Sequence, residues 1–127
     1  MKVQLQQINS QEEIDKLAIA AKEIWQECFT EIITTEQIDY MVEKFQSAKA
    51  IMAQIKQEGY LYFGLKRGEL YIGYVAVCPQ DSALFLSKVY LKQAYRGKGY
   101  ASMLLNKAEE VAAGRNLSKI YLTVNRQ

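Results

Sequence analysis

The feature that most constrains the fold is a loop with two glycines that joins a strand-like segment to a helix-like one. Residues 95–101 read Tyr-Arg-Gly-Lys-Gly-Tyr-Ala and follow residues 83–92, which are rich in aromatic and aliphatic side chains. After the loop, apolar residues recur every three or four positions up to Gly114, which is typical of a helix with one buried face. Residues 118–124 then form a second strand-like segment. This order predicts two parallel strands connected by a helix that packs on the sheet.

The segment before the loop begins with a short strand that includes Val3 and Leu5 and continues with two predicted helices. Ser10 with Glu13 forms a capping box, which predicts that a helix starts there. Thr34 has a glutamine three residues later and predicts a second start in the same way. Apolar residues keep helical spacing from Thr34 to Gly59, so this second helix is predicted as one continuous element.

Residues 60–79 predict a β-hairpin whose turn lies at Arg67 and Gly68. The next strand is expected to alternate strictly between two faces. One face would carry Phe85, Ser87, Val89 and Leu91, and the other Leu84, Leu86, Lys88 and Tyr90. The predicted fold is therefore mixed α+β, with a mostly antiparallel sheet and one parallel strand–helix–strand unit.

Composition and charge restrict the classes of function. A chain of 127 residues is long enough for one domain, 1–127, and half of its residues are hydrophobic. The net charge of +2 does not favour nucleic acid, and no apolar stretch reaches the length of a membrane span. The N-terminus lacks the apolar core of a signal peptide, so we expect a cytoplasmic protein.

The cysteines and the missing histidine exclude several kinds of site. Cys28 and Cys78 have neither the close spacing of a zinc ligand pair nor any histidine to join them, so no metal is expected. We expect both to be buried, reduced thiols with a structural role. The absence of histidine also excludes a Ser-His-Asp triad.

The glycine loop is suited to a phosphate group. Gly97 and Gly99 allow positive φ angles and leave room for a ligand against the backbone. The helix that follows offers unpaired N–H groups and the positive end of its dipole. No acidic residue occurs between Asp81 and Glu109, whereas five cations do: Lys88, Lys92, Arg96, Lys98 and Lys107. We therefore predict a polyanionic ligand, the alternative being a tight turn with solvated lysines.

Two common phosphate-binding loops fit the segment poorly. A Walker loop has a longer glycine spacing and ends in Gly-Lys-Ser or Gly-Lys-Thr, which this loop lacks. A dinucleotide-binding fold places its loop after the first strand and an acidic residue at the end of the next strand. Here the loop comes late, and the strand after it ends in Thr123, Val124 and Asn125.

Residues 88–127 resemble the acetyl-CoA-binding half of the GNAT acetyltransferase superfamily. The family signature is Gln/Arg-x-x-Gly-x-Gly/Ala, and Arg96, Gly99 and Ala101 occupy its three specified positions. The expected order of strands and helices also resembles the family fold over the whole chain. The resemblance implies an N-acetyltransferase that moves an acetyl group from acetyl-CoA to a primary amine of a small molecule or a peptide.

The resemblance also implies which residues bind the acetyl-CoA. The main chain of three strand residues would pair with the pantetheine arm: Val89, Tyr90 and Leu91. Main-chain N–H groups of the loop would hold the pyrophosphate, at Gly97, Lys98, Gly99, Tyr100, Ala101 and Ser102. Arg96 is expected to fix the loop, and Lys92 to be a solvated cation.

The catalytic groups are not assigned. In the family, a tyrosine that often protonates the leaving thiolate follows the segment at which this chain ends, so we expect a truncated member or one completed by a partner, as in a homodimer. Glu27, Glu31 and Tyr40 fall in the region that borders the acceptor groove in the family, although solvation explains the two glutamates equally well. Two alternatives stay open: an acyl-CoA-binding regulatory or inactive module, and a structural protein without affinity for CoA.

Overall fold

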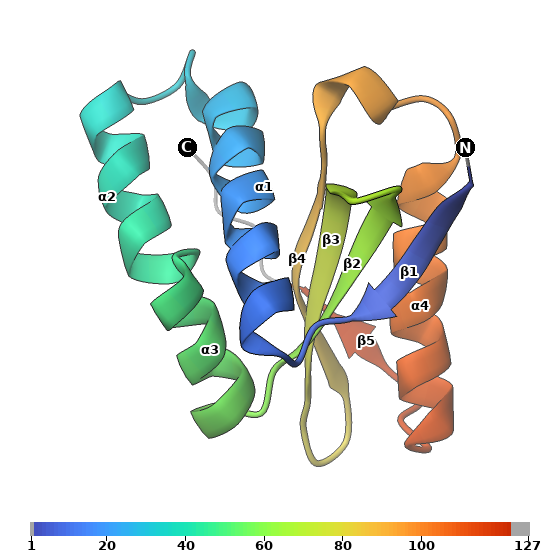
Figure 1. The fold of residues 1–127 in the computed structure, drawn as a ribbon. Helices are drawn as coiled ribbons and strands as arrows, with labels where there is room; N and C mark the ends of the chain where they lie inside the picture. The colour runs from blue at the N-terminus through green and yellow to red at the C-terminus, as the bar shows by residue number, and fades with distance from the viewer. Residues whose placement is uncertain (1, 123–127) are drawn as a thin grey trace.

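A five-stranded sheet forms the centre of the fold (Figure 1), in a computed structural model that describes residues 2–122. The strands are β1 (Val3–Gln7), β2 (Leu61–Arg67), β3 (Leu70–Pro79), β4 (Leu84–Leu91) and β5 (Ile120–Tyr121). They lie side by side in chain order, with antiparallel pairing from β1 to β4 and parallel pairing of β5 with β4. The predicted mixed α+β class is confirmed. The last residues of the predicted final strand lie outside the described residues.

Helices cover both faces of the sheet (Figure 1). One face carries α1 (Gln11–Phe29), α2 (Thr35–Phe45) and α3 (Ala48–Gln57), and the other carries α4 (Tyr100–Gly114). Both predicted capping boxes are present, at the starts of α1 and α2. A single 3₁₀ turn, η1 (Gln93–Tyr95), connects β4 to the glycine loop.

The prediction of one helix from Thr34 to Gly59 is wrong, because the helix breaks between α2 and α3. The Ser47 hydroxyl caps the new helix by accepting the N–H of Ala50 at 3.1 Å. At the break, the fully buried Gln46 side chain accepts the hydroxyl of Tyr74 and donates to that of Tyr62. Apolar residues keep helical phase across the break, so periodicity could not reveal it.

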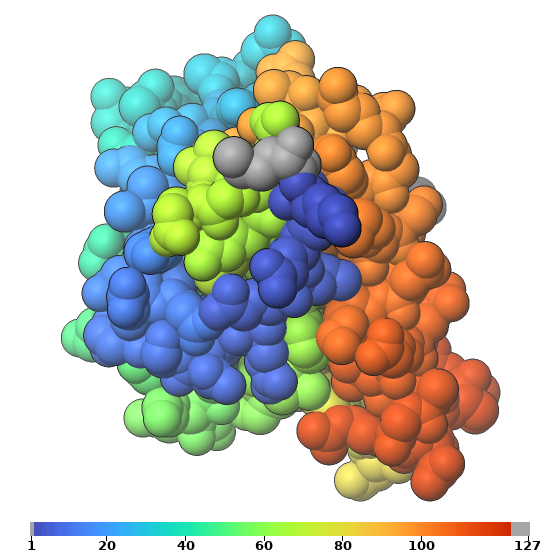
Figure 2. All heavy atoms as spheres, turned by 45° about the vertical axis from the view of Figure 1, so that its right-hand side comes forward, coloured from blue at the N-terminus to red at the C-terminus, as the bar shows by residue number. Residues whose placement is uncertain are grey.

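The two faces of the sheet have different cores. Under α1 and α3, aliphatic side chains pack with the buried tyrosines Tyr62, Tyr71 and Tyr74. Under α4 the buried side chains are aliphatic except for Phe63, and the helix contributes Leu104, Ala108 and Ala112. Figure 2 shows α4 running along one side of the molecule with the N-terminal segment beside it. The cofactor loop predicted above lies at the start of α4, on the edge of this second core.

Candidate functional site

The glycine loop has the backbone conformation that the sequence predicted. Gly97 and Gly99 have φ angles of 76° and 85°, a left-handed conformation that favours glycine. Gly99 is the N-cap residue of α4, and no side chain caps the N–H groups of the first turn. A Cβ atom placed on either glycine would meet nothing within 4 Å, so the backbone lies open to a ligand. The loop therefore offers several N–H donors and a helix N-terminus to one anion.

Arg96 ties the loop to the sheet and to α1. Its Nε atom donates to the carbonyl oxygen of Leu91 at 3.2 Å. One terminal nitrogen of the guanidinium lies 3.1 Å from the Sγ atom of Cys28. These contacts hold the start of the loop against the end of β4. The loop geometry thus rests on a side chain as well as on the glycines.

A cleft of about 330 Å³ lies between the loop and β4, and we call it the loop cleft. Its lining residues are Cys28, Val89, Tyr90, Leu91, Arg96, Gly97 and Ala101. Six of them are residues predicted from the sequence, and the seventh, Cys28, comes from α1.

The prediction that both cysteines are buried is wrong, since Cys28 and Cys78 are free thiols of intermediate exposure.

Main-chain groups of β4 are left open along the cleft. The N–H of Lys92 donates to the carbonyl oxygen of Ile72 at 2.8 Å. The main-chain groups of Lys92 therefore point toward β3. Because these directions alternate along an antiparallel strand, Tyr90 also faces β3, whereas Val89 and Leu91 face away from it. Among the described residues, β5 pairs only with Leu84 and Phe85, so it does not reach this part of β4. We call the outward main-chain groups of Val89 and Leu91 the open edge.

The prediction of strict alternation along β4 is wrong, because the strand contains a bulge. Ala76 of β3 pairs with Lys88 and Val77 pairs with Leu86, which leaves Ser87 as an extra residue. As a result, Leu86 and Val89 pack in the same core, under α4. The bulge also turns the Lys88 side chain toward the tyrosines of the opposite face.

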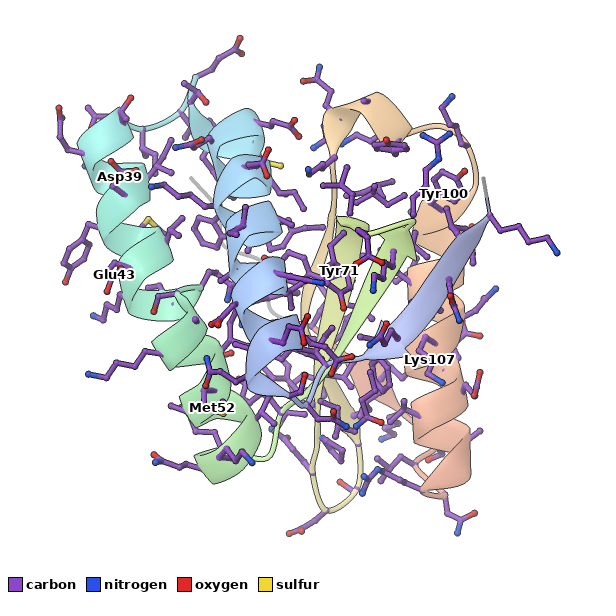
Figure 3. The ribbon with its side chains drawn as sticks, viewed as in Figure 1. Asp39, Glu43, Met52, Tyr71, Tyr100 and Lys107 are labelled. Carbon is purple, nitrogen blue, oxygen red and sulfur yellow. The ribbon has the colours of Figure 1, made fainter. Side chains whose placement is uncertain are left out.

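The five predicted cations do not form one exposed patch. Lys92 is only 8% exposed and lies 3.6 Å from the Glu23 carboxylate, so the expectation of a solvated cation is wrong. Lys107 pairs with Glu110 at 3.1 Å and lies well along α4 from the loop (Figure 3). Lys98, inside the loop, is exposed. The number of cations in the sequence therefore overstates the free positive charge beside the loop.

The three residues considered as bases have different positions. Glu27 accepts the N–H of Gln93 at 2.9 Å and so holds η1 in front of the loop. Glu31 is exposed beyond the end of α1. Tyr40 is 65% exposed on α2 and lies near the Lys44 ammonium. None of these observations gives any of the three a role in proton transfer.

Two tyrosines of the site have partners that explain their positions. Tyr90 lies in an aromatic group with Trp25, Phe29 and Tyr74, and burial raises the pKa of its hydroxyl. Tyr100 opens α4 next to the loop (Figure 3), with its ring 6.4 Å from that of Tyr95. Tyr90 therefore forms part of the cleft wall as a neutral side chain. Tyr100 packs against Tyr95 where the loop enters α4.

Sequence reasoning missed the contribution of α1 to the site. Glu23 and Glu27 both reach the segment after β4, and Cys28 reaches Arg96. Glu27 and Cys28 follow Glu23 by four and five residues, which places the three near one another on a helix but does not show which segment they face.

The comparisons with known proteins point to one family. A family model described as "Acetyltransferase (GNAT) family" matches residues 18–127. A comparison with curated proteins gave no match. Among solved structures, the PaiA N-acetyltransferase from Thermoplasma acidophilum in complex with coenzyme A has a TM-score of 0.87 and 22% identity. That alignment covers 100% of this chain and 82% of the other.

Two further structures have the same fold at lower identity. The predicted acetyltransferase with acetyl-CoA from Clostridium acetobutylicum has a TM-score of 0.72 and 16% identity, with 98% of this chain and 82% of the other covered. The ribosomal-protein-alanine N-acetyltransferase from Brucella melitensis has a TM-score of 0.68 and 17% identity, with the same coverage of 98% and 82%. Within residues 2–122, no helix has both the length and the apolar composition needed to cross a membrane.

Proposed function

Because the chain belongs to the acetyltransferase (GNAT) family, we propose that it transfers the acetyl group of acetyl-CoA to a primary amine. Membership of the family makes the chain an acyltransferase of the acetyltransferase type. The identity of the acyl donor, acetyl-CoA, and that of the acceptor, a primary amine, are our proposal. The observation that carries the proposal is the continuous path from the glycine loop to the open edge of β4.

The loop is the proposed site of the pyrophosphate. The donors are main-chain N–H groups of the loop and the first turn of α4: Gly97, Lys98, Gly99, Tyr100, Ala101 and Ser102. Two positive-φ glycines without Cβ atoms let phosphate oxygens approach these donors. Arg96 keeps the loop in place through its bond to the Leu91 carbonyl. Its role is therefore positioning.

The open edge is the proposed site of the pantetheine arm. An amide-containing chain that lies beside a strand can pair with it as an additional strand does. Val89 has both of its main-chain groups directed outward, and Leu91 has its N–H so directed, while its carbonyl is taken by Arg96. Tyr90 is bound to β3 through its backbone and contributes its side chain to the wall of the loop cleft.

The proposed reaction is attack of a neutral amine on the thioester carbonyl. The new C–N bond replaces the C–S bond, the amine loses one proton, and the thiolate gains one. A lysine-like amine has a pKa of about 10, so a base must accept its proton near neutral pH. We assign neither this base nor the acid. The acceptor class is a small-molecule or peptide amine.

Calorimetric titration of the purified chain with acetyl-CoA tests the proposal, followed by an assay of thiol release with a panel of amines. We expect saturable binding and amine-dependent release of CoA. Titration with pantetheine, which lacks the pyrophosphate, serves as the control and should give much weaker binding. Binding without turnover on any amine would favour the acyl-CoA-binding module. A folded chain that does not bind acetyl-CoA would contradict the proposal.

A further inference from the structure

A second groove lies beside β4, on the side of the sheet that α4 covers. It measures about 330 Å³. Its wall is formed by Leu86, Ser87, Lys88, Val89, Leu105 and Leu122. We call it the bulge groove, because it lies at the bulge of β4. Four of its six residues are aliphatic, so the groove is suited to an apolar ligand.

The polar side chains of the wall have partners away from the groove. The Nζ atom of Lys88 lies 5.3 Å from the ring centroid of Tyr60 and 5.8 Å from that of Tyr62. Tyr62 belongs to the core under α1 and α3, on the opposite face of the sheet. The Ser87 hydroxyl accepts a hydrogen bond from the same ammonium at 3.1 Å. The surface left to the groove is therefore mainly that of its leucines and Val89.

The loop cleft and the bulge groove follow one another along two elements. On β4, Leu91 borders the loop cleft, Leu86 borders the bulge groove, and Val89 borders both. On α4, Ala101 borders the loop cleft, and Leu105, about one turn later, borders the bulge groove. Helix α4 runs opposite to β4, because it connects β4 to the parallel strand β5. The two elements therefore give the same order, and one elongated ligand can occupy both hollows.

This order gives a direction to a bound acyl-CoA. The proposed pyrophosphate site begins at Gly97, and the proposed pantetheine arm runs back along the open edge from Leu91 to Val89. The thioester and its acyl group lie at the far end of that arm. An acyl chain that continues in the same direction passes Val89 and enters the bulge groove. Among the described residues, the pairing of β5 with β4 stops at Phe85 and leaves this path open.

The bulge groove is larger than the methyl group of acetyl requires. A cavity of about 150 Å³ accommodates benzene, which has six carbons. The bulge groove measures about 330 Å³ and extends along β4 from Leu86 to Val89, at most about 10 Å. Leu105 is 42% exposed and Leu122 is 56% exposed, so both offer apolar surface that a bound chain would remove from water.

We propose that the bulge groove holds the acyl chain of the donor, so that the protein accepts straight-chain acyl-CoA thioesters longer than acetyl-CoA, up to about six carbons. This inference rests on the proposed function, because it needs the pyrophosphate at the loop and the arm on the open edge. The reaction keeps the balance given above: a C–N bond replaces the C–S bond, the amine loses one proton, and the thiolate gains one. Attack occurs at the acyl carbonyl carbon, and the chain beyond it stays in the groove.

Calorimetric titration of the purified chain with acetyl-CoA, butanoyl-CoA and hexanoyl-CoA tests the inference. Complete burial of one methylene strengthens binding about fourfold, and an open groove should supply about half of that free energy, or about twofold. Hexanoyl-CoA has four more methylenes than acetyl-CoA and should therefore bind about 15-fold more tightly. Equal affinity for the two thioesters would overturn the inference.

Leu105→Gln removes apolar wall from the groove with a residue that suits a helix. We expect the ratio of hexanoyl-CoA affinity to acetyl-CoA affinity to fall to about threefold or less. Leu70→Gln is the matched control, because Leu70 is 47% exposed and borders neither hollow, and it should keep the wild-type ratio. Both leucines are exposed, so neither change should prevent folding. An unchanged ratio in Leu105→Gln would contradict the inference.

Two further titrations separate the groove from unspecific apolar binding. Dodecanoyl-CoA has a chain longer than the groove, so its affinity should exceed that of hexanoyl-CoA only slightly. A steady rise up to twelve carbons would indicate unspecific binding and overturn the inference. Gly99→Val, which is expected to prevent binding at the loop, should bind every thioester weakly. Hexanoyl-CoA binding of wild-type strength in that variant would also overturn it.

The outcomes also distinguish this inference from the proposed function. If acetyl-CoA binds and affinity does not depend on chain length, the inference fails and the proposed function stands. If a folded chain binds none of the thioesters, both fail. Binding of hexanoyl-CoA without binding of acetyl-CoA would support the inference and overturn acetyl-CoA as the donor. A rise with chain length that Leu105→Gln loses and Leu70→Gln keeps supports both.

Discussion

The two halves of β4 differ in what lies on their outer side. At Leu84 and Phe85 the strand pairs with β3 on one side and with β5 on the other. At Val89 and Leu91 it pairs with β3 alone among the described residues, and its outer main-chain groups border the loop cleft. The bulge at Ser87 separates the two halves.

This difference teaches that one strand can be paired on both sides at one end and keep main-chain groups open at the other, where we propose that acetyl-CoA binds. Leu84 is completely buried under α4, and its N–H donates to the Lys119 carbonyl at 2.8 Å. Val89 and Leu91 pack their side chains in the same core but keep main-chain groups available. Changes in the first half should therefore affect folding, and changes around the second half should affect binding.

The largest expected effect is on stability, from Leu84→Ala. Loss of a fully buried leucine side chain should lower the free energy of unfolding by about 3 kcal/mol, as measured by urea denaturation. Acetyl-CoA affinity should stay unchanged at temperatures where the variant is folded. Leu70→Ala, at a residue that is 47% exposed, is the control and should cost less than about 1 kcal/mol. A folded Leu84→Ala protein that binds acetyl-CoA weakly would erase the distinction between the two halves.

Gly99→Val should produce the largest effect on binding. A β-branched side chain beside the loop N–H groups blocks the approach of phosphate, so we expect acetyl-CoA affinity to fall about 100-fold in calorimetry. Gly59→Val is a matched control, because Gly59 has a φ of 78° and equally open surroundings away from the loop. Both variants should lose similar stability from backbone strain. Equal acetyl-CoA affinity in the two variants would contradict the loop assignment.

The smallest expected effect is that of salt. Because Lys92 and Lys107 already have carboxylate partners, screening acts mainly on Lys98 and on the loop backbone. Raising the salt from about 0.05 M to about 0.5 M should weaken acetyl-CoA binding about threefold. Lys98→Ala should remove most of this dependence. A much steeper response in the wild-type chain would show that the loop relies on side-chain charge after all.

Much of the fold could be predicted because its signals are local. The capping boxes of Ser10 and Thr34, the hairpin turn at Gly68 and the helix after Gly99 depend on residues within a few positions of one another. The break before α3 could not be predicted in this way. It depends on Gln46 meeting tyrosines of β2 and β3, which come 16 and 28 residues later in the chain.

The site was predicted in part for the same reason. The loop cleft contains Arg96, Gly97 and Ala101, which the glycine motif had indicated. The motif did not indicate that the Arg96 guanidinium contacts the thiol of Cys28, because the two residues are 68 positions apart in the chain. The motif also did not indicate to which side of the sheet the Lys88 side chain points, because that depends on the bulge in the pairing of β3 with β4.

The sequence by itself determined the order of the strands, the starts of α1, α2 and α4 and the positive-φ loop, since caps and glycine conformations involve only neighbouring residues. The tertiary structure decided which cations are exposed, which edge of β4 stays open and which face Lys88 occupies. Each of these depends on partners brought together from distant parts of the chain. Burial, ion pairing and strand pairing are set by those partners, and no local pattern contains them.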